Sequence, residues 1–126
     1  MYFQDQFKKP APFSPDVAVS VDDVVERKLD MLDAHVSQVY EWLPWHDGYL
    51  DQVPKDPQAR RIWLRKQWGW TMEISPAVRE ALVQWYGPDK AKGIALAEAF
   101  EICEYGYQPS REELRRLFPF FPSQQK

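Results

Sequence analysis

The segment DDVVERKLDMLDAHVSQVYEWLP, from Asp22 to Pro44, carries the clearest periodic pattern in the chain. Its apolar residues recur at helical spacing and fall within about 60° of Val25 around a helix axis. These residues are Val25, Leu29, Leu32, Val36, Val39 and Tyr40. The pattern predicts one amphipathic helix of about five turns, with Asp22 as its N-cap and Pro44 as its end.

A row of mostly polar side chains borders this apolar stripe. Lys28, Met31, His35 and Gln38 follow one another at steps of three, four and three residues, so on a continuous helix they share one ridge. A polar ridge at the border of a core-facing stripe indicates contact with something other than bulk water. The sequence does not identify that contact.

Two short strands are predicted before the helix. The first covers MYFQD, residues 1–5, and the second covers DVAVSV, residues 16–21, where valines alternate with smaller or polar residues. The second strand leads almost directly into the long helix. This part of the chain is therefore predicted to be a strand-to-helix unit.

Start signals of helices recur along the second half of the chain. Asp56-Pro57 opens a helix that ends near Gly69, and Ser75-Pro76 opens one that ends at Gly87-Pro88. A capping box of Ser110 and Glu113 begins the last helix, and the phenylalanines of the tail FPFFPSQQK are expected to lie against the body of the protein.

Residues 93–105 are compatible with a helix by propensity and with a strand by alternation. The fold class predicted from residues alone is α/β and mostly helical, with two to three short strands and about four helices. The expected layout is a single domain, with a strand–loop–strand–long helix part over residues 1–45 and a helical extension over 46–126 that carries any strand at 94–104.

Composition narrows the class of protein. A chain of 126 residues supports one domain, and a net charge of −3 without a basic block argues against a nucleic-acid partner. Cys103 is the sole cysteine and is expected to be reduced. No segment resembles a signal peptide or a membrane span, so we expect a soluble, cytoplasmic protein. Aromatic residues make up 15% of the chain, with six tryptophans, which suggests a surface that meets another protein segment.

Motifs for metal or nucleophilic chemistry are missing from the sequence. His35 and His46 are not at H-x-x-x-H or H-E-x-x-H spacing, and one cysteine cannot form a thiolate cage. Ser37 would point about 200° away from His35 on a helix. Cys103 lies among apolar residues and is interpreted as a buried thiol. We therefore predict no catalytic residue and no metal ligand within this chain.

Three glutamates, Glu98, Glu101 and Glu104, surround Phe100 at three-residue spacing. On a helix they would form a solvated stripe. On a strand Glu98 would share a face with Phe100, and its carboxylate could point into a pocket.

Residues 19–38 resemble a segment of a known family. VSVDDVVERKLDMLDAHVSQ is similar to the segment of PIG-L (LmbE-like) de-N-acetylases in which a strand leads into a helix with a K…L..H.SQ pattern, here Lys28, Leu32, His35, Ser37 and Gln38. YFQDQF (2–7), YEWLPW (40–45) and AEAFEICEYG (97–106) also resemble family members that have a longer C-terminal region. The resemblance spans most of the chain.

The resemblance implies a Rossmann-like α/β fold and zinc-dependent hydrolysis of an N-acetyl group on a glucosamine-type sugar. In that family a metal-bound water attacks the amide carbonyl, with a carboxylate as general base. The family's metal and base residues lie in H-P-D-D and H-P-D-H type motifs. This sequence contains no H-P dipeptide, so the resemblance transfers no zinc ligand to it.

Two functions from different classes follow. The first is the C-terminal portion of a PIG-L-type deacetylase, inactive alone because the metal-binding half is missing, with zinc and an N-acetylated sugar substrate belonging to the intact enzyme. Lys28, His35, Gln38 and Glu98 would then border the substrate pocket. His35 and Gln38 could equally serve only to tie the helix to neighbouring backbone. The second function is a free-standing, mostly helical interaction module whose aromatic residues meet a protein partner.

Overall fold

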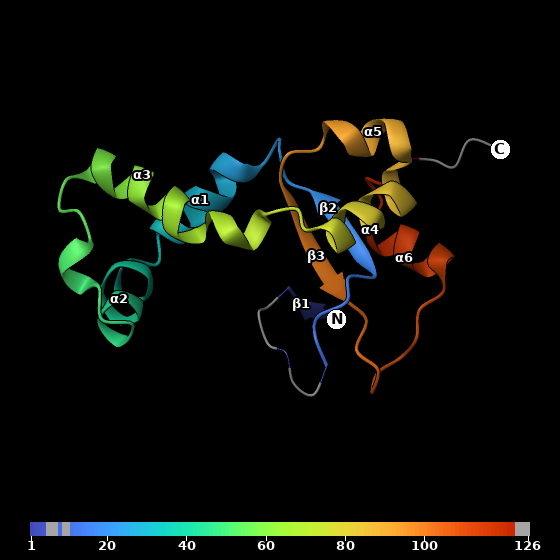
Figure 1. The fold of residues 1–126 in the computed structure, drawn as a ribbon, viewed down its shortest axis with the longest axis horizontal. Helices are drawn as coiled ribbons and strands as arrows, with labels where there is room; N and C mark the ends of the chain where they lie inside the picture. The colour runs from blue at the N-terminus through green and yellow to red at the C-terminus, as the bar shows by residue number, and fades with distance from the viewer. Residues whose placement is uncertain (5–7, 9–10, 123–126) are drawn as a thin grey trace. The chain divides into compact units, whose positions relative to one another are not determined.

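The computed structural model describes residues 1–4, 8 and 11–122, which form two compact units. Unit 1 is built from Met1–Asp22 and Thr71–Lys126, and unit 2 is the continuous segment Asp23–Trp70. Within the described residues the chain has six α-helices and a three-stranded antiparallel sheet, and it is mostly helical (Figure 1). The mixed α/β, mostly helical class predicted from the sequence is confirmed.

The sheet of unit 1 has the strand order β1-β3-β2. Strand β1 (Tyr2–Phe3) and strand β2 (Val17–Ser20) both pair antiparallel with the central strand β3 (Ala97–Glu101). The predicted first strand is therefore confirmed at Tyr2–Phe3, while positions 5–7 lie outside the described residues. The open choice at residues 93–105 is settled as a strand over Ala97–Glu101.

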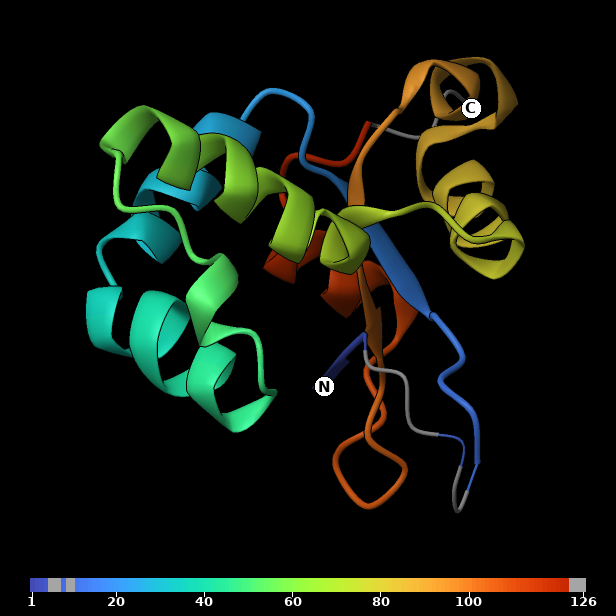
Figure 2. The same ribbon diagram turned by 60° about the vertical axis from the view of Figure 1, so that its left-hand side comes forward.

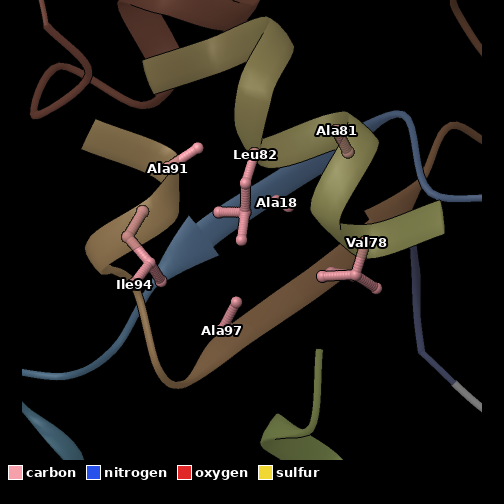
Figure 3. Close-up of a cluster of buried hydrophobic side chains, with 8 residues drawn as sticks. Ala18, Val78, Ala81, Leu82, Ala91, Ile94 and Ala97 are labelled. Carbon is pink, nitrogen blue, oxygen red and sulfur yellow. The ribbon is translucent and has the colours of Figure 1, made fainter. Parts of the chain in front are cut away.

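The two faces of the sheet carry side chains of different size. Ala18, Ala97 and Ala99 point to one face and pack against helices α4 (Pro76–Tyr86) and α5 (Pro88–Gly93). Figure 3 shows Val78 and Leu82 of α4 directed toward this alanine surface, with Ile94 following α5. Small strand residues bring the helix backbone close to the sheet, so this core is compact.

The other face is covered by large aromatic and aliphatic groups. Val17 and Trp85 pack with Leu114 of helix α6 (Arg111–Leu117) and with Phe121. The rings of Trp85 and Phe121 stack with centroids 4.7 Å apart. The predicted packing of the tail phenylalanines is confirmed for Phe118 and Phe121, whereas residues 123–126 lie outside the described part of the chain.

Two aspartates fasten β2 to the ends of β3. At one end the Asp16 carboxylate accepts a hydrogen bond from the Ile102 backbone N–H at 2.7 Å. At the other end Asp22 accepts from the Leu96 and Ala95 backbone N–H groups at 2.8 and 3.1 Å. The N-cap role predicted for Asp22 is therefore wrong, because its carboxylate satisfies the loop before β3 instead of a helix terminus.

Unit 2 contains helix α1 (Val25–Asp33), the π-helix η1 (Ser37–Trp42), helix α2 (Leu43–His46), the 3₁₀ turn η2 (Leu50–Gln52) and helix α3 (Pro57–Trp68). A further 3₁₀ turn, η3 (Gly69–Met72), leads the chain from unit 2 into unit 1. Helix α3 lies beside α1 (Figure 2). Arg61 of α3 joins the two helices by ion pairs to Glu26 and Asp30, at 2.9 and 2.6 Å.

The single five-turn helix predicted over Asp22–Pro44 is wrong in two respects. The helix breaks after Asp33, where the His35 N–H bonds to the Leu32 carbonyl three residues back. The Tyr40 hydroxyl donates to the Asp33 carboxylate at 2.5 Å and so joins the two sides of the break. The break shifts the helical phase, and Val36, assigned to the apolar stripe, is 45% exposed.

Pro44 does not end the helical path, because α2 runs through it to His46. Proline lacks an N–H and its ring crowds the carbonyl four residues earlier, here that of Tyr40. The wider π-turn relieves this crowding, since the Leu43 N–H bonds to the Gln38 carbonyl five residues back.

The helix starts signalled by a polar cap followed by proline are confirmed. The Asp56 carboxylate accepts from the Ala59 N–H at the start of α3, and the Ser75 hydroxyl accepts from the Val78 N–H at the start of α4. The capping box of Ser110 and Glu113 is present at the start of α6. Helix α5 was not predicted from the sequence, although Pro88 at its first position carries the usual signal.

Within the described ranges, no helix is long and apolar enough to cross a bilayer.

Candidate functional site

The four residues proposed from the sequence to border a pocket fall into two groups. Lys28 lies on α1, His35 in the break after it and Gln38 on η1, all in unit 2. Glu98 lies on β3 in unit 1. Three of the four candidates therefore belong to unit 2, and the fourth belongs to unit 1.

The unit 2 group does not sit on one continuous helix. Lys28 is half-buried, whereas the side chains of His35 and Gln38 are exposed. The helix break between positions 28 and 35 replaces the regular ridge expected from the residue spacing. His35 and Gln38 present hydrogen-bonding groups to the surroundings of unit 2, and an imidazole with a carboxamide can both donate to and accept from hydroxyl groups.

Glu98 lies opposite Val19 in the sheet register and shares the face of Phe100. Its side chain is half-buried and has an interaction partner. The strand alternative is therefore correct for Glu98 and Glu101, and the helical stripe is wrong. Glu101 accepts a hydrogen bond from the Ser14 N–H at 3.1 Å, and Glu104 lies on an exposed turn.

The residues that the structure describes do not offer a zinc site. In residues 1–4, 8 and 11–122 no group of three or more His, Cys, Asp or Glu side chains is arranged to hold a metal ion. His46, the second histidine, has its Nδ1 2.8 Å from the Asp47 carboxylate and its ring 5.5 Å from the ring of Trp42. Both neighbours lie on the same exposed segment as His46.

A cavity of about 500 Å³ that the sequence did not predict lies in unit 1. Its apolar wall is formed by Met1, Ile102, Pro109 and Leu117. Its polar lining is formed by Cys103, Tyr107, Glu113 and Arg116. These side chains come from the N-terminus, the loop after β3 and helix α6, so only the tertiary fold brings them together.

Cys103 is half-buried in this lining, so the interpretation of it as a buried thiol is wrong in its degree of burial, although Met1 and Ile102 line the same cavity. Its sulfur lies 3.1 Å from the Tyr2 hydroxyl. The Tyr2 hydroxyl, followed by the backbone N–H groups of Tyr105 and Gly106, lowers the pKa of the Cys103 thiol because these donors stabilise the thiolate. The same hydrogen bond is the largest cause that raises the pKa of Tyr2 to about 12.

Glu113, which also lines the cavity, accepts hydrogen bonds from three donors. The Tyr107 hydroxyl donates to Glu113 Oε1 at 2.6 Å, and the Ser110 N–H and hydroxyl donate to Oε2 at 2.8 and 2.7 Å. These bonds, that of Tyr107 being the largest cause, lower the pKa of Glu113 to about 2. The carboxylate is thus ionised at neutral pH and its acceptor positions are occupied.

The sequence predicted the capping box, and with it the hydrogen bonding between Glu113 and Ser110. The pairing of Cys103 with Tyr2 was not readable, because no local signal links residues separated by most of the chain.

No family model, no curated protein and no solved structure matches this chain.

Proposed function

We propose that this chain is the C-terminal portion of a zinc-dependent N-acetyl-sugar deacetylase of the PIG-L type, and that it is catalytically incomplete by itself. The observation that carries the proposal is the pattern of Lys28, Leu32, His35, Ser37 and Gln38 in the segment that follows a short strand. The observed order of β2 followed by α1 supports the strand-to-helix unit that this resemblance implies.

The proposal includes a Rossmann-like fold, with which the strand directions of the sheet have to be compatible. Rossmann-type sheets are mostly parallel, but antiparallel strands occur at the edge of such sheets. The β1-β3-β2 sheet is antiparallel throughout its described strands. Under the proposal it belongs to the margin of a larger sheet, and the parallel strands belong to the portion of the enzyme that precedes this chain.

Zinc in the intact enzyme would be held by residues outside this chain, since the described residues do not fit a metal site. No reaction step is therefore assigned to residues of this chain. The exposed His35 imidazole and Gln38 carboxamide are suited to hydrogen-bond sugar hydroxyls. Lys28 contributes a positive charge to the same unit, and Glu98 contributes a negative charge in unit 1.

The coding DNA upstream of Met1 tests this proposal directly. We expect it to encode an H-P-D-D motif, either in frame or after a shift of reading frame. A stop codon and a ribosome-binding site directly before Met1, together with a monomeric and cooperatively folding purified chain, would contradict the proposal.

The role of His35 is tested in a full-length relative by the equivalent of His35→Ala. We expect turnover to fall by at least about tenfold, with an unchanged melting temperature and zinc content, because the exposed imidazole contacts substrate. The equivalent of Glu41→Ala, at an exposed position of η1, is the control and should leave turnover unchanged. A large loss of stability with activity retained would assign His35 a structural role.

A protein-interaction module is the second candidate, and one observation favours it. Trp42 and Trp45 of unit 2 lie three residues apart on a helical path and are 49% and 66% exposed. Large exposed aromatic residues are typical of interaction surfaces. This candidate predicts that Trp45→Ser abolishes binding to a protein partner while the chain stays folded. The deacetylase proposal instead predicts that the remainder of the enzyme covers Trp45.

A further inference from the structure

The cavity beside α6 has the size and the apolar lining of a small-molecule site. Its volume of about 500 Å³ falls within the range of about 300–1,000 Å³ for ligand pockets. Met1 and Leu117, two of its apolar lining residues, are 50% and 65% exposed. The apolar wall therefore remains uncovered by the described part of the chain.

Several described hydrogen-bond acceptors next to this wall already receive hydrogen bonds. Glu113 receives three hydrogen bonds from Tyr107 and Ser110. The Gln108 side-chain N–H₂ donates to the carbonyls of Cys103 and Gly106 at 3.0 and 3.1 Å. A ligand with a donor group, such as an amine, would share acceptors that already receive hydrogen bonds.

The donor groups of Arg116 are not occupied in the same way. Arg116 is exposed, lines the cavity and acts on Glu113 and Tyr107 only through its charge. Among the described residues it makes no hydrogen bond or ion pair. A guanidinium carries five N–H donors in a fork that matches the two oxygens of a carboxylate.

We propose that this cavity binds a small molecule with an apolar body and one carboxylate, the body packing on Ile102, Pro109 and Leu117 and the carboxylate pairing with Arg116. The site lies entirely within unit 1 and is independent of the proposed deacetylase function, whose N-acetyl-sugar substrate is polar. A single arginine and an apolar wall do not suit a polyphosphate, which requires several cationic or backbone donors.

Cys103 provides a local reporter for the test, because it is the sole cysteine of the chain and lines the cavity. The rate of its alkylation by iodoacetamide, followed by mass spectrometry, is measured on the full chain with phenylbutyrate, phenylbutylamine or phenylbutanol present. These three probes share one apolar body and differ in the terminal group.

We expect phenylbutyrate to slow alkylation at concentrations below about 1 mM. The concentration that gives half-maximal protection should be at least about tenfold lower for phenylbutyrate than for the amine or the alcohol. Isothermal titration of phenylbutyrate into the unmodified chain should give the same order of affinities. Equal protection by all three probes, or none by phenylbutyrate, would overturn the proposal on the unmodified chain alone.

Arg116→Ala is expected to weaken phenylbutyrate protection at least about tenfold, and Arg116→Lys to retain part of it, because lysine keeps the charge but loses the fork. Arg27→Ala, at an exposed position of α1 in unit 2, removes one positive charge from a residue that does not line the cavity and should have no effect. Circular dichroism checks the fold of each variant. Unchanged protection in a folded Arg116→Ala chain would exclude the arginine–carboxylate pairing.

Discussion

The Tyr2 hydroxyl lies 3.1 Å from the sulfur of Cys103 and is the largest cause that lowers the pKa of this thiol. A donor to sulfur stabilises the thiolate over the thiol, so its removal raises the thiol pKa. We expect Tyr2→Phe to shift the pH profile of Cys103 alkylation to higher pH. Tyr49→Phe, which removes a hydroxyl in unit 2, is the matched control. Identical profiles for Tyr2→Phe and the unmodified chain would rule out this hydrogen bond in solution.

Glu113 makes the stability of the α6 region dependent on acid. Its pKa is lowered from 4.5 to about 2 in the folded protein. Because the folded-state value lies below the unfolded one, the ionised carboxylate stabilises the fold fully above about pH 4.5, and this stabilisation is lost as the pH falls toward 2.

We therefore expect Glu113→Gln to destabilise the protein at neutral pH and to reduce the further loss of stability between about pH 4.5 and 2. Urea midpoints measured across this range give the comparison. Glu112→Gln, one residue earlier and exposed, should keep the acid dependence of the unmodified chain. Identical dependence of the urea midpoint on pH in the two variants would contradict the role assigned to the Glu113 carboxylate.

At the scale of the element, Asp22 holds β2 and the entrance to β3 together. Asp22→Ala leaves the N–H groups of Ala95 and Leu96 without their acceptor, which should cost about 1–3 kcal/mol of unfolding free energy. Chemical denaturation measures the loss. Asp23→Ala, the same change at the next and exposed position, is the control. Equal losses in both variants would mean that Asp22 acts only through its charge.

Local signals predicted the elements that depend on local chemistry. Asp56, Ser75 and Ser110 each accept a hydrogen bond from a backbone N–H three residues later, and the helices begin where these caps predict. Asp22 is also a residue type that caps helices, yet its carboxylate accepts from the backbone N–H groups of Ala95 and Leu96 in the loop before β3. A side chain that has both local and distant partners cannot be assigned from sequence alone.

For the candidate site, too, the features that depend on local sequence were predicted and those that depend on tertiary packing were not. The strand interpretation placed Glu98 on the face of Phe100, because alternation along a strand is a local property. The break after Asp33 was not predicted, since the Tyr40–Asp33 bond and the π-turn before Pro44 depend on packing in unit 2. The cavity was missed because its lining residues from the N-terminus and α6 meet only in the folded chain.

At the scale of the whole molecule, unit 1 is assembled from two segments that are distant in sequence. Leu82 of α4 is fully buried against Ala18 of β2 and Ala97 of β3. We expect Leu82→Ala to reduce the unfolding free energy by about 2–5 kcal/mol. Amide hydrogen exchange should then accelerate in β2 and β3 together.

Leu117→Ala, on the exposed side of α6, is the control for this change and should leave exchange in both strands unaltered. Faster exchange in only one of the two strands after Leu82→Ala would show that β2 and β3 do not unfold as one cooperative unit.

The insertion of unit 2 between β2 and the rest of unit 1 has a consequence for synthesis of the chain. Strand β2 emerges from the ribosome well before β3, and at about 5–20 residues per second the wait lasts several seconds. During that interval the backbone edge of β2 has no β3 to pair with, and the side chains of Val17 and Ala18 have no core to pack in, so β2 is open to misassociation. The Asp23–Trp70 segment emerges before β3, and contact between α1 and α3 shortens the loop that must close when β2 pairs with β3. We therefore expect the time between the synthesis of β2 and that of β3 to influence the yield of folded unit 1.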